Sequence, residues 1–285
     1  MQHGQPSRTA LSAASHRAAH QVLERGSIFS DPLAARILGA DAETAVRVAE
    51  NEPDRRKMRL FIAIRTRFAE DSLAAAVARG VRQLVVLGAG LDTYAYRHCE
   101  GSGLRIFEVD HPSTQAWKRQ RLAEAAIPAP RSLTFAPVDF ERETLADGLG
   151  AAGFDPERQT FFTWLGVVPY LTQEAIFSTL GFVGGLPGGA HVVFDYANPA
   201  ARGSGQDEAY ASYLSSHSAR VASLGEPFRS FFETDALHAR LGSLGFREVE
   251  DLGPVSMRAR FFDKGTVPRS DRGGHVVRAA TVAGP

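Results

Sequence analysis

Residues 85–97, VVLGAGLDTYAYR, decide the fold. An apolar run suited to a buried strand ends in a turn that contains Gly88 and Gly90, and Asp92 follows directly. Glycine lets a ligand approach the main chain because no Cβ stands in the way. A GxG turn alone is a weak signal, so its meaning depends on the elements on either side of it.

Apolar runs of strand length alternate with helical patterns along most of the chain. The expected strands are 84–87, 105–109, 133–138, 160–165 and 191–196, with 246–252 and 275–282 near the C-terminal end. The expected helices are 9–25, 31–49 and 55–79 before the first strand, and 113–126, 145–152 and 173–183 between later strands. This alternation predicts an α/β fold with parallel strands and crossover helices, and the last two strands suit an antiparallel edge pair.

The composition is that of an ordinary globular chain. It has 285 residues, of which 44% are hydrophobic and 22% are charged, and 32 basic residues balance 32 acidic ones. No overall field therefore favours nucleic acid or a membrane as a partner. The single cysteine, Cys99, excludes an internal disulfide framework, and we find neither a spanning apolar run nor a convincing signal peptide. These observations predict a cytoplasmic location and leave the oligomeric state open.

The glycine turn lies where a first strand meets a helix, which is the edge at which α/β sheets bind ligands. Asp110 ends the second strand about twenty residues further on and can accept hydrogen bonds from ribose hydroxyls. Alternatively, Asp110 caps the helix that begins near Pro112. A dinucleotide needs a third glycine where Thr93 stands, and Asp92 would oppose its pyrophosphate. S-adenosyl-L-methionine (SAM) has no phosphate, so the turn favours SAM over NAD.

Several motifs in order resemble the leucine carboxyl methyltransferase family. They are RTRFAEDSL (65–73), the glycine turn, FEVDHPSTQAWKRQRL (107–122), TFAPVDF (134–140) and WLGVVPYLT (164–172). The likeness is greatest to a bacterial branch of O-methyltransferases, some of which act on natural products. It implies a class I SAM-dependent methyltransferase: a Rossmann-like, mostly parallel sheet with an antiparallel edge. It also implies a helical extension over 1–79 that contributes to the SAM site, a SAM-binding core over 80–196, an insertion or lid over 197–240, and edge strands over 241–285.

The resemblance also implies a set of cofactor-binding residues. They are Arg65, Gly88, Ala89, Gly90, Asp110, Asp139 and Phe140. Arg65 would pair with the methionyl carboxylate, as a guanidinium does well, and the turn at Gly88 would face the methionyl part. Asp110 would bind the ribose, and Asp139 and Phe140 would bracket the adenine. Leu165 stands where eukaryotic members carry an acidic residue, which weakens the case for methylation of a protein C-terminal carboxylate.

The methyl acceptor is less defined by the sequence. Methyl transfer is a direct displacement, which depends on holding the acceptor in line. A carboxylate acceptor needs no base, whereas a hydroxyl usually does, and Asp195, His111 and His217 are available without any spacing that selects one. We therefore assign no catalytic residue. We expect Tyr170, Tyr196, Tyr210 and Tyr213 to contact the acceptor.

The sequence thus predicts a SAM-dependent O-methyltransferase that acts on a small-molecule carboxylate or hydroxyl. The alternatives are methylation of a protein C-terminus and a SAM-binding protein without activity. His16 and His20 have the i, i+4 spacing of metal ligands but lack an evident third partner, so we expect a surface pair and no metal.

Overall fold

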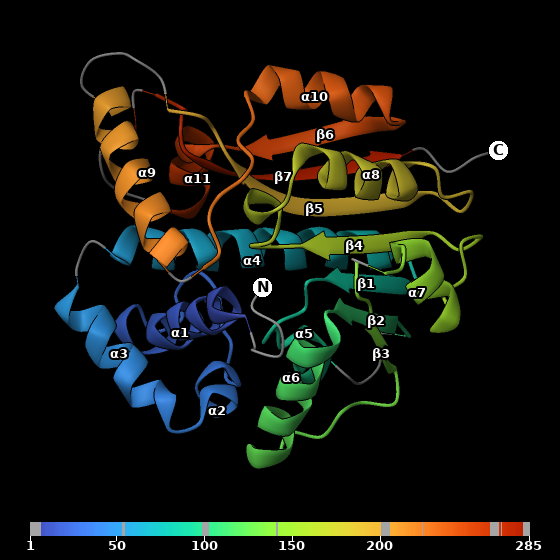
Figure 1. Ribbon diagram of the computed structural model, residues 1–285, viewed down its shortest axis with the longest axis horizontal. Coiled ribbons are helices and arrows are strands. Elements are labelled where there is room, and N and C mark those ends of the chain that lie inside the picture. Colours follow the sequence, from blue (N-terminus) through green and yellow to red (C-terminus); the bar gives the residue numbers. More distant parts are fainter. Residues whose placement is uncertain are drawn as a thin grey trace. The chain divides into compact units, whose positions relative to one another are not determined.

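The strands of the computed structural model form one mixed sheet in the order β3-β2-β1-β4-β5-β7-β6 (Figure 1). The structure describes residues 7–52, 55–98, 103–140, 142–200, 206–223, 225–262, 268 and 270–281, and Cys99 and residues 201–205 of the expected insertion lie outside them. The strands are β1 (Gln83–Leu87), β2 (Arg105–Asp110), β3 (Leu133–Pro137), β4 (Thr160–Trp164), β5 (Ala190–Ala197), β6 (Phe246–Leu252) and β7 (Gly274–Thr281). Each expected strand is therefore present, within a residue or two of its expected bounds.

Residues 1–161 and 162–285 form two compact units. The first contains the helices α1 (Arg8–Leu23), α2 (Ala34–Leu38), α3 (Asp41–Asn51), α4 (Arg55–Ala78), α5 (Tyr94–Arg97), α6 (Pro112–Glu124) and α7 (Leu145–Ala151). In this unit α1 contacts α2, α3 and α4, as the blue and teal helices of Figure 1 show. The single helix expected over 31–49 is wrong, because the chain turns at Gly39, whose φ of +59° favours glycine and ends α2.

The first unit brings three strand ends to one edge of the sheet. β1 pairs in parallel with β2, with Leu87 opposite Val109, and β2 pairs in parallel with β3. All residues of β1 are buried, which explains its unbroken apolar sequence, since a parallel strand is covered on both faces. Because parallel strands end at the same edge, Gly88, Asp110 and Asp139 are brought to that edge together.

The second unit contains the antiparallel edge. Its helices are the 3₁₀ turn η1 (Val168–Tyr170), α8 (Gln173–Gly184), α9 (Gln206–Ser223), α10 (Thr234–Ser243) and α11 (Pro254–Phe261). β7 runs antiparallel to both β5 and β6, which confirms the expected edge pair. α8 contacts β5, and α10 and α11 contact β6. In the described ranges, the helices are too short or too polar to cross a bilayer.

Candidate functional site

The turn after β1 is closed by its own backbone and by Asp92. The Ala89 amide donates to the Val109 carbonyl of β2 at 3.1 Å, and the Asp92 amide donates to the Ala89 carbonyl at 2.7 Å. Asp92 Oδ1 then accepts from the Tyr94 amide at 2.8 Å, which is an Asx turn that leads into α5. The half-buried carboxylate of Asp92 is thus built into the turn, where it would repel a pyrophosphate.

The two glycines of the turn have different surroundings. Both have a left-handed φ, +64° at Gly88 and +42° at Gly90, which glycine adopts without strain. Gly88 is exposed and leaves its main chain open to a ligand. Gly90 is buried, and a Cβ built there would lie 2.9 Å from the Cβ of Ala10 in α1. The second glycine therefore allows a helix of the N-terminal extension to pack on the turn, a role that the sequence pattern did not indicate.

Asp110 links the turn to the end of β2. Its Oδ2 accepts from the Gly90 amide at 2.6 Å and its Oδ1 accepts from the His111 amide at 2.7 Å. The alternative that Asp110 caps α6 is wrong, because the N-cap is His111, whose Nδ1 accepts from the Ser113 amide at 3.2 Å. Burial raises the pKa of Asp110, and the two amide hydrogen bonds oppose this shift. Each carboxylate oxygen keeps a lone pair that can accept from a ribose hydroxyl.

Arg65 lies on α4, which is tied to the same turn. The Arg65 side chain is buried, and its guanidinium carbon lies 5.8 Å from the centre of the Phe61 ring. Further along α4, the Glu70 carboxylate pairs with Arg97 of α5 through both oxygens. The same helix thus carries Arg65 and holds α5, the helix that directly follows the turn. The pairing of Arg65 with a methionyl carboxylate stays a prediction.

Asp139 and Phe140 follow β3 at the third strand end. Asp139 is half-buried, and its Oδ2 lies 3.5 Å from Nε of Arg142. Phe140 is 59% exposed, which is unusual for a phenylalanine and leaves a ring face free to stack on a planar group. The structure therefore brings Gly88, Asp110, Asp139 and Phe140 to one edge of the sheet, and their binding of a nucleoside stays a prediction.

A buried contact between Lys118 and Glu108 links the elements around the turn. Lys118 Nζ of α6 lies 2.8 Å from Oε2 of Glu108 in β2, and both side chains are 1% exposed. Tyr96 of α5 donates its hydroxyl to the same oxygen at 3.3 Å and presents its ring 5.3 Å from Lys118 Nζ. Burial raises the pKa of Glu108 to about 7, although Lys118 acts in the opposite direction.

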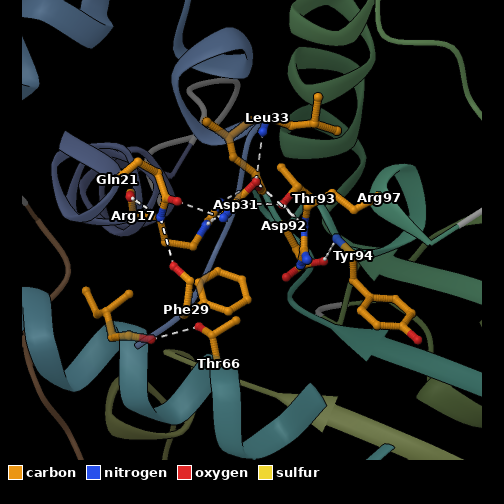
Figure 2. Close-up of polar contacts among 12 residues, drawn as sticks. Arg17, Gln21, Phe29, Asp31, Leu33, Thr66, Asp92, Thr93, Tyr94 and Arg97 are labelled. Atoms are coloured by element: carbon orange, nitrogen blue, oxygen red, sulfur yellow. Dashed lines mark hydrogen bonds and ion pairs between the residues drawn. The ribbon is translucent and has the colours of Figure 1, made fainter. Parts of the chain in front are cut away.

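Two residues of the N-terminal extension, Arg17 and Asp31, contact the turn, and the sequence did not predict these contacts. Figure 2 shows that Asp31, from the turn between α1 and α2, accepts from the Thr93 hydroxyl, and that Arg17 of α1 donates to the same Asp31 oxygen. Asp31 is 0% exposed and Arg17 is 8% exposed. The Asp31-Pro32 pair indicates a turn, but the burial of this carboxylate depends on contacts far along the chain and leaves no local signal.

The histidines of α1 are buried, so the expected surface pair is wrong. His16 is 7% exposed and His20 is 0% exposed. Nδ1 of His20 lies 3.2 Å from Oε2 of Glu24, which in turn accepts two hydrogen bonds of 2.8 Å from Arg59. Burial lowers the pKa of His20 against the opposing effect of Glu24. In the part of the chain that the structure describes, we find no group of three metal-ligating side chains.

In the second unit, Tyr196 and Tyr210 use their hydroxyls in internal hydrogen bonds. The buried Tyr196 donates to Asp251 Oδ2 at 2.7 Å and lies 3.0 Å from the Thr234 hydroxyl. Burial, with Asp251 nearby, raises the pKa of the Tyr196 phenol. Tyr210 of α9 donates to the Asn198 carbonyl at 2.7 Å. Both tyrosines thus hold segments of the unit together, and contact with an acceptor stays a prediction for them.

Tyr170 and Tyr213 lie in a group of half-buried rings, which we call the aromatic cluster. Its members are Tyr170, Tyr213, His217, Phe228 and Phe231. The Tyr213 and His217 rings stack with centres 5.8 Å apart and an interplanar angle of 4°. Phe228 contacts His217 at 5.4 Å, Tyr170 at 5.3 Å and Phe231 at 6.0 Å. The cluster joins α9 to the segments after β4 and after α9.

The three possible bases have different environments. Asp195 is 3% exposed and accepts from the Gly166 amide at 2.5 Å, which fixes the loop after β4. His111 caps α6. His217 lies among the rings of the aromatic cluster. Each of the three thus has a structural contact of its own, and none is assigned as a base.

Comparison with known proteins gives a consistent result. The family model described as leucine carboxyl methyltransferase matches residues 10–184. YktD of Bacillus subtilis strain 168, which is assigned as a SAM-dependent methyltransferase, is 36% identical over 204 residues, covering 70% of this chain and 64% of YktD. A protein of Frankia alni with the same assignment is 38% identical over 184 residues, covering 62% and 64% of the two chains. The chain thus spans less than two thirds of the length of these relatives.

A solved structure of human N-acetylserotonin methyltransferase in complex with SAM has a TM-score of 0.45 and 16% identity, covering 96% of this chain and 68% of that one. Because this likeness is low, the fold assignment rests on the strand order and the pairing of the chain's own sheet.

Proposed function

The chain belongs to the leucine carboxyl methyltransferase family, and from this premise we propose that it is a SAM-dependent methyltransferase that acts on an oxygen atom of a small molecule. The assignments of YktD and of the Frankia protein support the reaction class. The carboxylate or hydroxyl nature of the acceptor, and a place in natural-product metabolism, are further parts of the proposal.

The observation that carries the proposal is the exposed main chain of Gly88 in a turn whose Gly90 amide is bonded to Asp110. Such an edge fits SAM, which needs close backbone contact for its methionyl part and a carboxylate for its ribose. Arg65 would pair with the methionyl carboxylate, and Asp139 and Phe140 would bind the adenine. When bound, SAM supplies an electrophilic methyl group on a sulfonium.

The aromatic cluster supports an aromatic acceptor. Rings at 5–6 Å from one another, as between Tyr170, Tyr213 and Phe228 and their neighbours, offer faces and edges on which a planar molecule packs favourably. Their half-buried state fits an acceptor that has to be shielded from water. A phenol acceptor would need a general base, whereas an aromatic carboxylate is already ionised and needs only positioning.

The test is calorimetric titration with S-adenosylhomocysteine (SAH), with NAD as the comparison ligand. We expect micromolar binding of SAH, no binding of NAD, and loss of SAH binding in Asp110→Ala. The control is Asp71→Ala, which removes an exposed carboxylate paired with Arg67 on the surface of α4. Absence of SAH binding by the unmodified chain, or a preference for NAD, would contradict the proposal.

A panel of aromatic carboxylates, phenols and C-terminal peptide carboxylates then separates the possible acceptors. We expect methylated product from a small aromatic acceptor, either a phenol or a carboxylate. Product from the peptide alone would favour the protein-directed alternative. SAH binding without product from any acceptor would favour a SAM-binding protein that lacks activity.

A further inference from the structure

We infer that Asp31 is a positioning residue of the cofactor turn: its buried carboxylate docks the N-terminal helices onto residues 90–93, and cofactor affinity depends on this docking. The inference rests on the proposed function, because it concerns the affinity of the same SAM site. Asp31 lies outside the glycine motif, yet by this inference it controls the conformation of that motif.

The Asp31 carboxylate is the junction between the extension and the turn (Figure 2). Its Oδ2 accepts from the Thr93 hydroxyl at 2.8 Å and from Arg17 Nε at 3.2 Å. Its Oδ1 accepts from the Leu33 amide at 3.1 Å and lies 3.6 Å from Arg97 Nε. A fully buried carboxylate is stable only when it is paired and hydrogen-bonded, so the loss of one of these contacts would destabilise the others.

The extension contacts the turn at several positions along its length. Ala10 packs against Gly90 so closely that a Cβ on Gly90 would lie 2.9 Å from its own Cβ. Arg17, while it donates to Asp31, also donates from Nη2 to the Leu91 carbonyl at 2.5 Å. Asp31 then holds the Thr93 hydroxyl. A shift of the extension would therefore move this whole side of the turn.

The same turn carries the contact to the expected ribose ligand. The Gly90 amide donates to Asp110 Oδ2 at 2.6 Å, so the position of Gly90 sets the orientation of the Asp110 carboxylate. Gly90 is thus held between Ala10 on the extension and Asp110 on β2. Undocking of the extension would loosen this arrangement and disorder the groups that face the cofactor.

Two side chains, those of Gln21 and Arg97, fix the position of Asp31. Gln21 of α1 accepts from the Asp31 amide through Oε1 at 2.9 Å and donates from Nε2 to the Phe29 carbonyl at 3.0 Å. On the other side, Arg97 pairs with Glu70 of α4 and lies with its guanidinium carbon 5.0 Å from the centre of the Phe29 ring. The carboxylate is therefore held in a fixed position rather than recruited from a flexible loop.

If docking of the extension favours cofactor binding, then cofactor binding must favour docking by the same factor, because coupling between two equilibria is reciprocal. This reciprocity gives a measurement that does not depend on turnover. SAH should slow the hydrogen exchange of the α1 amides in the unmodified chain, and it should lose this effect in a chain whose docking contact is broken.

The primary variant is Asp31→Asn, which keeps the shape of the side chain. An amide has one accepting oxygen, so its NH₂ group would stand in place of either Oδ2, which accepts from Arg17 and Thr93, or Oδ1, which accepts from the Leu33 amide and faces Arg97. The matched control is Asp41→Asn, which also removes a carboxylate that pairs the extension with the core, since Asp41 Oδ2 lies 2.5 Å from Arg121 Nη2. That pair lies on the surface, with the Asp41 side chain 52% exposed, and it joins α3 to α6 rather than to the turn.

Titration with SAH at a temperature well below the unfolding midpoint of each variant decides the question. We expect the Kd to rise at least tenfold in Asp31→Asn and to change less than twofold in Asp41→Asn. A second variant, Arg17→Lys, keeps the charge but cannot reach both Asp31 and Leu91, and we expect its Kd to rise as well. Far-UV and near-UV circular dichroism confirm that each variant is folded.

The outcomes separate the inference from the function on which it rests. A role for Asp31 in stability alone would lower the melting temperature but leave both the Kd and the SAH-dependent exchange of α1 unchanged, and this would overturn the inference. A rise of the Kd in Asp41→Asn equal to that in Asp31→Asn would also overturn it. Failure of the unmodified chain to bind SAH would overturn the proposed function and the inference with it.

Discussion

Substitution of Gly90 by alanine tests the packing of α1 on the glycine turn. Gly90 has a φ of +42°, a region that costs an alanine roughly 1–2 kcal/mol. The added Cβ would also lie 2.9 Å from the Cβ of Ala10, where carbon atoms prefer about 3.5–4.0 Å, and overpacking of this kind costs about 1–3 kcal/mol. We therefore expect Gly90→Ala to lower the free energy of unfolding by about 2–5 kcal/mol.

A double-mutant cycle separates the two causes. Ala10→Gly removes the atom that the new Cβ would meet, at a cost of about 1 kcal/mol for a glycine within a helix. It cannot relieve the backbone strain at position 90. In equilibrium urea unfolding, the double variant should therefore be more stable than the sum of the single effects by roughly 1–2 kcal/mol.

The control is Gly80→Ala, which has the strain without the contact. Gly80 has a φ of +109°, and among the described residues no atom lies within 4 Å of a Cβ built on it. Its effect should add to that of Ala10→Gly without coupling. Additivity within about 0.5 kcal/mol for Gly90→Ala and Ala10→Gly would refute the close packing of α1 on the turn.

Two further predictions concern Glu108, which is buried in β2, and Phe140, which is exposed after β3. The folded protein keeps a proton on Glu108 between about pH 4.5 and 7, where the unfolded chain has lost it, so the free energy of unfolding should fall by roughly 1–3 kcal/mol as the pH rises through this window. Urea unfolding at pH 5 and pH 8 should show this fall, and Glu108→Gln should remove it; an unchanged pH dependence in the variant would contradict the assignment. Phe140→Ala should change stability by less than about 0.5 kcal/mol because the ring is 59% exposed, yet weaken SAH binding by roughly 2–10-fold through lost stacking. Equal SAH affinity in calorimetry would show that Phe140 does not stack on the adenine.

Much of the fold could be predicted from local pattern. Strands appear in the sequence as short apolar runs, and the unbroken run at β1 indicates a strand buried on both faces, which the structure confirms. The helix breaks were harder: Gly39 divides the segment 31–49 because its left-handed φ ends α2, although the alanine-rich pattern continues beyond it. The helix expected directly after the glycine turn is α5, whose bounds could not be predicted because a helix of one turn has no periodicity to detect.

For the site, the sequence alone determined the residue types at the strand ends, namely the glycines, Asp92, Asp110, Asp139 and Phe140, together with the family that these motifs resemble. Tertiary structure alone decided that Gly90 faces Ala10, that Asp31 is buried against Thr93, and that Tyr196 bonds to Asp251. The physical reason is that the pattern of residue types indicates the local conformation of each element and the face that it buries. The partner that covers this face comes from residues tens of positions away, and only the folded chain brings the two together.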